Sequence, residues 1–197
     1  MRAFLFLPLL AACAAPAPDL RAGLTRDAID AFGQPLLYVE TTGGASLLRA
    51  DAQNGPIRTW RADEGVSLSA EGGVIVATRG LGGDLMSADV TGTRVALAGG
   101  PRDDYPRLHS YLDGENVTQF RAFRCEMTLA PPEQIASFGL TIAVTRAEET
   151  CYSTMDPIRN TYWLGGDGTA WRTRQWVSDR VGHVVTELLR PSERTSE

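Results

Sequence analysis

Short runs of apolar and polar residues follow one another along most of the chain, and their period is mainly that of β-strands. Alternation at every second position, interrupted by Gly, Asn and Asp, predicts antiparallel strands joined by tight turns. Strands are expected at 36–42, 47–52, 57–62, 66–70, 74–78, 107–112, 118–129, 139–150, 161–164, 170–177 and 184–189. Asn54-Gly55 and the loops 113–116 and 165–168 are typical hairpin turns. The pattern therefore predicts an all-β fold, an antiparallel barrel-like or sandwich domain.

Three segments depart from the strand pattern. Residues 19–32 carry apolar side chains at helical spacing, with Asp19 as N-cap and Gly33 as a stop, so one N-terminal helix is expected. Residues 135–138 are predicted to form a loop or a short helical turn. Asp84, in a Gly-rich segment, is expected to cap another short helical turn.

The beginning of the chain has the layout of an export signal. Arg2 precedes an apolar run, and Leu10-Ala11-Ala12-Cys13 resembles a bacterial lipobox. The apolar run of ten residues is about half the roughly 20 that a membrane-spanning helix needs. We expect residues 1–12 to be a lipoprotein signal peptide and Cys13 to be lipidated, the alternative being a plain secretory signal with a chance cysteine.

The rest of the chain is expected to consist of a tether, one domain and a short tail. Residues 13–18 are rich in Ala and Pro and are expected to form a tether between the lipid and the domain. Residues 19–191 show no internal repeat or linker and are expected to form a single β-rich domain. Residues 192–197 are expected to be a frayed tail.

Composition and charge exclude several classes of function. The chain of 197 residues has a formal net charge of −5, and all 19 of its basic side chains are arginines. Nucleic-acid binding needs a basic face, so no nucleic-acid partner is expected. With only two histidines and three cysteines, His-rich metal sites and zinc ribbons are excluded, and no metal or other cofactor is expected.

Two cysteines remain once Cys13 is assigned to lipid. In an exported protein, Cys125 and Cys151 lie in an oxidising compartment and are expected to form a structural disulfide. Two buried free thiols, or a redox pair, are the alternatives. A redox pair would favour Cys-x-x-Cys spacing, which these residues lack.

Aromatic and basic residues are concentrated near the C-terminus. Aromatic rings beside guanidinium groups can stack on sugars and bind acidic groups, so this cluster is a candidate partner or glycan contact. The alternative is that the aromatic rings form the barrel core. Trp171 and Trp176 should point to opposite faces of their strand, so at most one is expected in the core of a one-sided sheet. The candidate residues are Tyr162, Trp163, Trp171, Arg172, Arg174 and Trp176.

Catalytic constellations are not apparent in the sequence. His109 and His183 are far apart, no serine lies in a nucleophile elbow, and each histidine is expected to be an ordinary surface or loop residue. Glu148 and Glu149 are adjacent on an expected strand and should point to opposite faces, which disfavours a two-carboxylate glycosidase. No catalytic residue is assigned.

Two stretches carry a family resemblance. Residues 73–85 resemble the YjbF/GfcB lipoproteins, as does a second stretch that starts at Asn160, includes the segment Trp171-Arg172-Thr173-Arg174-Gln175-Trp176 and ends near 188–191. The lipobox and the cysteine pair fit this resemblance, which runs from about residue 13 to 191. The family is associated with group 4 capsule and exopolysaccharide operons.

The resemblance implies an antiparallel β fold and an outer-membrane lipoprotein that faces the periplasm. It also implies partners from the same operon, including a large outer-membrane β-barrel protein and a periplasmic protein. It supplies no catalytic residues. We therefore expect a non-enzymatic factor for assembly or export of polysaccharide, held to membrane lipid through acylated Cys13. The alternative is a glycan-binding module that contacts the polysaccharide directly.

Overall fold

The structure is a computed structural model and describes residues 19–100 and 102–191. Its three helices are α1 (Leu20–Gly23), α2 (Arg26–Ala31) and α3 (Thr91–Leu97). The strands are β1 (Leu36–Thr41), β2 (Gly44–Asn54), β3 (Ile57–Arg61), β4 (Ser67–Glu71), β5 (Val74–Arg79), β6 (Ser87–Asp89), β7 (Tyr105–Leu112), β8 (Thr118–Leu129), β9 (Glu133–Ser137), β10 (Leu140–Tyr152), β11 (Ile158–Gly165), β12 (Ala170–Ser178) and β13 (Gly182–Arg190).

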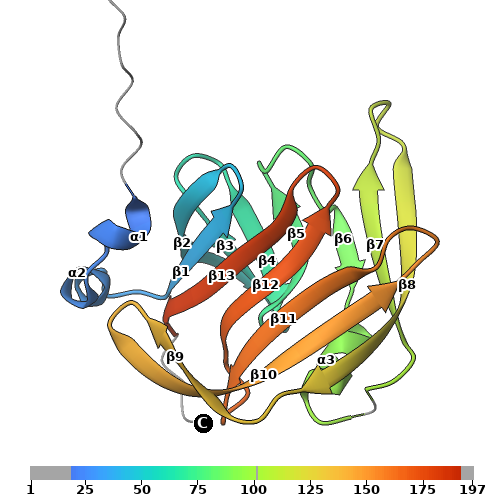
Figure 1. Cartoon of the computed structure of the whole chain (residues 1–197). Helices are drawn as coiled ribbons and strands as arrows, with labels where there is room; N and C mark the ends of the chain where they lie inside the picture. The colour runs from blue at the N-terminus through green and yellow to red at the C-terminus, as the bar shows by residue number, and fades with distance from the viewer. Residues whose placement is uncertain (1–18, 101, 192–197) are drawn as a thin grey trace, which may run out of the picture.

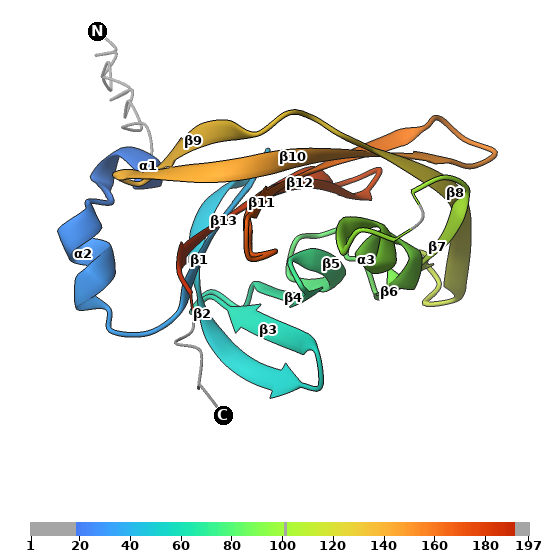
Figure 2. The same ribbon diagram turned by 90° about the horizontal axis from the view of Figure 1, so that it is seen from below.

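All strands belong to one antiparallel sheet that curls into a nearly closed barrel (Figures 1 and 2). The strand order is β5-β4-β3-β2-β1-β13-β12-β11-β10-β8-β7-β6, and β9 pairs with β10 beside β8. The two end strands lie near each other, and the Thr78 N–H on β5 donates to the carbonyl of Leu85, in the loop that leads into β6. The predicted all-β, barrel-like fold is confirmed.

Apolar residues form two clusters within the barrel and one outside it. The first inner cluster surrounds the Cys125–Cys151 disulfide and includes Trp176. The second includes Trp60 and Leu68, in the half of the barrel made by β1 to β4. The outer cluster lies where α1, α2 and the β9–β10 hairpin cover the outside of β1 and β13 (Figure 1), and its buried members are Ile29, Leu36, Tyr38 and Leu189.

The N-terminal helical segment is confirmed, but it is divided into two short helices. Asp19 caps α1 as predicted, because its side chain accepts from the Arg21 and Ala22 N–H groups. The chain then leaves the helical conformation at Leu24 and restarts at α2, where the Thr25 hydroxyl accepts from the Ala28 N–H. A second capping residue inside the segment therefore explains the division.

Two local predictions need correction. Residues 135–138 do not form a loop or helical turn, because 135–137 belong to β9, which pairs with β10. Asp84 caps no helix; its carboxylate accepts from the Gly80 and Leu81 N–H groups and the Thr78 hydroxyl, and so fixes the loop after β5. The Asp84 side chain therefore accepts from backbone N–H groups of a loop, not from those at the start of a helix.

The sequence pattern also missed β6 and α3. Helix α3 has no side-chain N-cap hydrogen bond and includes Gly92, so the usual start signals are absent. Packing explains the glycine: a Cβ on Gly92 would lie 2.8 Å from the Pro106 carbonyl oxygen and from the Tyr105 ring. Helix α3 thereby sits close against β7 at one end of the barrel (Figure 2).

Within 19–100 and 102–191, no helix combines the length and apolar character that crossing a membrane would require. The signal peptide, the lipidation site Cys13 and the tether 13–18 lie outside the described residues, as does the tail 192–197.

Candidate functional site

A buried carboxylate, that of Glu149 on β10, is the centre of a polar network inside the barrel. Its Oε1 accepts from the Thr93 hydroxyl at 2.6 Å and from the Tyr105 hydroxyl at 3.0 Å. Its Oε2 accepts from Arg107 Nη1 at 2.8 Å, Asn160 Nδ2 at 2.7 Å and the Tyr162 hydroxyl at 3.0 Å. Donors from α3, β7 and β11 thus converge on one carboxylate.

Strand alternation explains how these side chains meet. Successive side chains on a strand point to opposite faces, and the inward positions of β7 are Tyr105, Arg107 and His109. On β10 the same rule places Glu149 inside and Glu148 outside, as predicted. The Arg107–Glu149 ion pair is almost wholly buried, with side-chain exposures of 1% and 0%.

His109 continues the network, and its burial corrects the prediction of a surface or loop residue. Arg107 Nε–H donates to His109 Nε2 at 2.9 Å. Because Arg107 can only donate, His109 Nε2 is the acceptor and the ring proton lies on Nδ1, 2.8 Å from the Tyr111 hydroxyl. The Tyr111 hydroxyl in turn donates to the Val177 carbonyl at 2.8 Å. The His109 ring is fully buried and stacks on Trp176, at an interplanar angle of 11°.

Burial shifts the pKa values of this network. Desolvation, with help from the Arg107 and Arg121 charges, holds the pKa of His109 well below its ordinary value. Desolvation and the Glu149 charge raise the pKa of the Tyr105 and Tyr162 hydroxyls. At neutral pH the histidine and both tyrosines are therefore neutral hydrogen-bonding groups.

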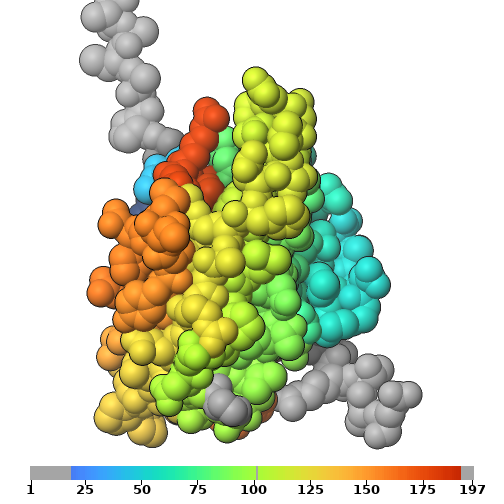
Figure 3. Space-filling model, turned by 90° about the vertical axis from the view of Figure 1, so that its right-hand side faces the viewer, coloured from blue at the N-terminus to red at the C-terminus, as the bar shows by residue number. Residues whose placement is uncertain are grey.

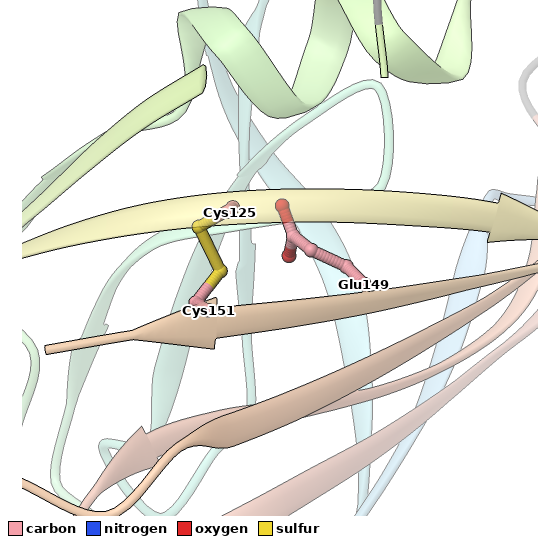
Figure 4. Close-up of side chains that lie close together, drawn as sticks. All are labelled: Cys125, Glu149 and Cys151. Carbon is pink, nitrogen blue, oxygen red and sulfur yellow. A yellow bond between two sulfur atoms is a disulfide. The ribbon is translucent and has the colours of Figure 1, made fainter. Parts of the chain in front are cut away.

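The arrangement is built for structure rather than reaction. Glu149 accepts five hydrogen bonds and has no exposed surface, so a substrate cannot reach its oxygens. The Cys125 and Cys151 sulfurs lie close to this carboxylate (Figure 4), an arrangement that resembles a metal-ligand set. They are joined as a disulfide, which confirms the predicted pairing and removes both as thiolate ligands. This set does not fit a metal ion.

The predicted C-terminal cluster does not form one surface. Tyr162 is fully buried at Glu149, and Trp176 is 9% exposed in the inner core. Trp171 is half-buried and lies beside the β11–β12 turn, where Gly165 approaches its indole ring. Of the two strand-mates, only Trp176 is in the core, in line with the expectation from strand geometry.

Trp163 and Arg172 lie on the outer face, beneath β9. Trp163 Nε1 donates to Glu133 Oε1 at 3.0 Å, and the Arg172 guanidinium lies 5.8 Å from the centre of the Trp163 ring. Arg172 also donates to the Ala136 carbonyl at 2.7 Å. Both candidate contact residues thus have roles in attaching β9 to the barrel.

A second buried carboxylate, Glu187 on β13, was missed by sequence reasoning. It lies outside the barrel wall under α1 and β9, pairs with Arg21 and Arg172, and accepts from the Ser137 hydroxyl at 2.6 Å. Burial raises the pKa of Glu187, but these hydrogen bonds outweigh burial and lower it overall. The missed signal is an acidic residue within the apolar strand 184–189.

Arg174 borders an open groove of about 520 Å³ at the end of the barrel where the β10–β11 and β12–β13 turns lie. Arg159, Trp176 and His183 also line it, and His183 Nε2 lies 2.9 Å from the Arg159 carbonyl oxygen. Among the described residues, neither the Arg159 nor the Arg174 guanidinium has an ion-pair partner. Desolvation lowers the pKa of His183, and the nearby Arg174 charge adds to this effect.

The β7–β8 hairpin projects beyond the barrel at this same end (Figures 1 and 3). Leu112 is 44% exposed, Val117 52% and Phe120 69%. Asp113 fixes the tip, because its carboxylate accepts from the Glu115 and Val117 N–H groups. The hairpin thus presents apolar side chains on an ordered turn.

Comparison with known families gives one match that covers most of the chain. The family model described as "Group 4 capsule polysaccharide lipoprotein gfcB, YjbF" matches residues 12–189. This range includes Cys13 and almost every described residue. No curated protein sequence matches the chain.

One solved structure supports the fold. The hypothetical lipoprotein YmcC from Escherichia coli (K12) superposes with a TM-score of 0.74 at 19% identity, covering 86% of this chain and 90% of that protein. An exported protein with a YmcC-like fold from Bacteroides fragilis has a TM-score of 0.37 at 13% identity, covering 80% and 93%. A lipoprotein from Parabacteroides distasonis has a TM-score of 0.39 at 11% identity, covering 79% and 92%.

Proposed function

Because the chain belongs to the YjbF family of group 4 capsule polysaccharide lipoproteins, we propose that it assists assembly or export of capsule or exopolysaccharide. It does so as an outer-membrane lipoprotein on the periplasmic face, anchored through acylated Cys13. The observation that carries this proposal is the family match over residues 12–189. Several acyl chains on one cysteine give stable anchoring, since each buried methylene contributes about 0.8 kcal/mol.

The role is that of a non-enzymatic partner of a secretion component. The enclosed Glu149 network supports this proposal, because its most polar groups are saturated and out of reach of a substrate. The projecting β7–β8 hairpin supports a protein contact, since aromatic and aliphatic side chains on an ordered element are typical of protein interfaces. Proteins encoded in the same operon, an outer-membrane β-barrel protein among them, are the proposed partners.

Gene deletion and complementation test the proposal. Deletion should lower surface polysaccharide under inducing conditions, and the wild-type gene should restore it. Cys13→Ser should not restore it, because the chain then lacks the residue that carries the lipid. Unchanged polysaccharide in the deletion strain would contradict the export role.

A matched pair of hairpin variants tests the contact. Phe120→Ser removes the most exposed apolar side chain of the hairpin and should lower complementation. Thr118→Ser, at an exposed position on the same strand, should complement fully. Equal complementation by both variants would show that the partner binds elsewhere.

A glycan-binding module is the second candidate, and one observation favours it. Arg159 and Arg174, without ion-pair partners in the described ranges, line the same groove as Trp176. Guanidinium groups bind carboxylate and phosphate in a bidentate manner, so an acidic sugar is the proposed ligand. An Arg159→Gln/Arg174→Gln variant should lose retention on immobilised native polysaccharide, whereas Arg61→Gln on β3 should not. Equal retention of both variants would exclude this groove.

A further inference from the structure

A second cavity lies inside the half of the barrel made by β1 to β4. It is part of neither the β7–β8 hairpin nor the groove lined by Arg159 and Arg174. It has a volume of about 270 Å³, and its mouth lies between the β2–β3, β4–β5 and β11–β12 turns. Leu37, Trp60, Leu68, Ala70 and Leu188 form its apolar walls. An apolar cavity of about 150 Å³ binds benzene, so this one is large enough for a substituted ring or a short acyl chain.

The walls and the mouth differ in polarity. Trp60, Leu68 and Ala70 are each less than 10% exposed, whereas Gln53 and Arg58 at the mouth are polar. Arg58 Nε donates to the Gln53 side-chain oxygen at 2.9 Å, and the Arg58 guanidinium lies 5.7 Å from the centre of the Trp60 ring. An apolar interior with an ordered polar rim is typical of small-molecule pockets, and barrel mouths are a common place for them.

Trp60 carries the second observation. Its side chain is more than nine-tenths buried and lines the cavity, yet in the described ranges its indole N–H donates to no acceptor. The Trp60 indole nitrogen is not one of the fully buried side-chain atoms that lack a hydrogen-bond partner, so its N–H keeps accessible surface and is open to an acceptor. Trp163, by contrast, has Glu133 as acceptor. A ligand that brings one acceptor oxygen into the cavity would satisfy this donor.

We propose that this cavity binds a small uncharged molecule with an apolar body and one acceptor oxygen, such as a short acyl ester or an aryl ketone. The apolar body fills the space between Leu37, Leu68 and Leu188, and the oxygen accepts from the Trp60 N–H. Sugars are disfavoured, because the apolar walls leave most hydroxyl groups unpaired. The proposal is independent of the export function.

Two probes of similar size separate the contributions of shape and hydrogen bonding. Acetophenone carries a carbonyl oxygen, and ethylbenzene does not. Both are titrated into the ¹⁵N-labelled full chain carrying Cys13→Ser. The chain has four tryptophans, so four indole N–H resonances are expected, and the one absent from Trp60→Phe belongs to Trp60. Acetophenone should shift this resonance and leave that of Trp163 unchanged.

Variants make the test quantitative. Trp60→Phe should weaken acetophenone about fivefold, the equivalent of ~1 kcal/mol for one hydrogen bond, and leave ethylbenzene unchanged. Ala70→Leu fills the cavity and should abolish binding of both probes, whereas Ala52→Leu on the outer side of β2 should not. If Ala70→Leu fails to fold, Leu188→Phe serves the same purpose.

Three results would overturn the proposal. The Trp60 resonance could stay unmoved at saturating acetophenone. The cavity-filling variant could bind like the wild-type chain. Finally, Trp60→Phe could weaken both probes equally, which would refute the acceptor requirement.

Discussion

Protonation of His109 should make the folded state less stable just below neutral pH. Its Nε2 accepts the Arg107 Nε–H and its Nδ1–H faces the Tyr111 hydroxyl, so the ring has no site for a second proton. Desolvation first, and then the Arg107 and Arg121 charges, hold its folded-state pKa well below 6.5. In the unfolded chain the same ring titrates near 6.5. Below that pH the unfolded state binds the additional proton, so stability falls as the pH falls.

The magnitude follows from the linkage relation. With a neutral folded-state ring and an unfolded pKa of about 6.5, lowering the pH from 7.5 to 5.5 should cost about 1.4 kcal/mol of unfolding free energy. Few other groups contribute in this window. Glu187 and the other carboxyl groups with lowered pKa titrate below it, and the buried tyrosines titrate above it. His183, whose pKa is also lowered, adds a smaller contribution of the same sign.

Urea denaturation at several pH values measures this effect. His109→Gln should remove most of the pH dependence between 7.5 and 5.5, while His183→Gln should keep it. If His109→Gln fails to fold, NMR titration of the wild-type chain replaces it, and the His109 ring signals should not move above pH 5.5. A His109→Gln protein with the wild-type slope, or a His109 ring that titrates near 6.5, would refute the reasoning.

The buried groups give three further predictions. Glu149→Gln should cost about 3–5 kcal/mol in chemical denaturation, because it leaves the buried Arg107 charge without its partner; a loss below 1 kcal/mol would contradict the account. Reducing Cys125–Cys151, which closes a loop of sequence separation 26, should cost about 3.5 kcal/mol in the chain-entropy model, as measured with and without reductant. Glu187 has a lowered pKa, so its contribution to the free energy of unfolding is present above about pH 4.3 and is lost as the pH falls further. Acid titration of Arg172→Gln should show a smaller loss of stability than the wild-type chain. An unchanged acid transition would speak against the ion pair.

Local patterns were enough to predict most strands, but not every one. Residues 122–128 alternate between exposed and buried positions, and β8 has the predicted bounds. Strand β9 follows Pro131-Pro132 and buries only Ile135 and Ser137, so five residues carry too little alternation to identify it. The N-cap residue of α3, Val90, offers no side-chain hydrogen bond, and only packing against β7 explains Gly92.

The polar network inside the barrel could not be predicted, for a different reason. Its members are brought together by the curl of the sheet, with a sequence separation of 42 between Arg107 and Glu149 and of 56 between Thr93 and Glu149. No local period encodes such pairings, and a lone histidine on a strand gives no sign of its partners. The disulfide was predictable because counting leaves only one pairing for Cys125 and Cys151.

The two stretches that carry the family resemblance contact each other across the barrel. Gln175 on β12 accepts from the Ile75 N–H at 2.9 Å and donates to the Gly73 carbonyl at 2.8 Å on β5. A Cβ on Gly73 would lie 2.3 Å from that of Ala170, so only glycine allows this approach. The Ser178 hydroxyl also donates to the Gly83 carbonyl, at 2.5 Å. Gln175 and Gly73, one from each stretch, therefore fasten opposite walls of the barrel. Architecture thus explains Gly73 and Gln175, whereas Arg174 and Trp176 of the second stretch line the open groove. The residues that contact a partner or polysaccharide are to be sought in that groove and on the projecting hairpin.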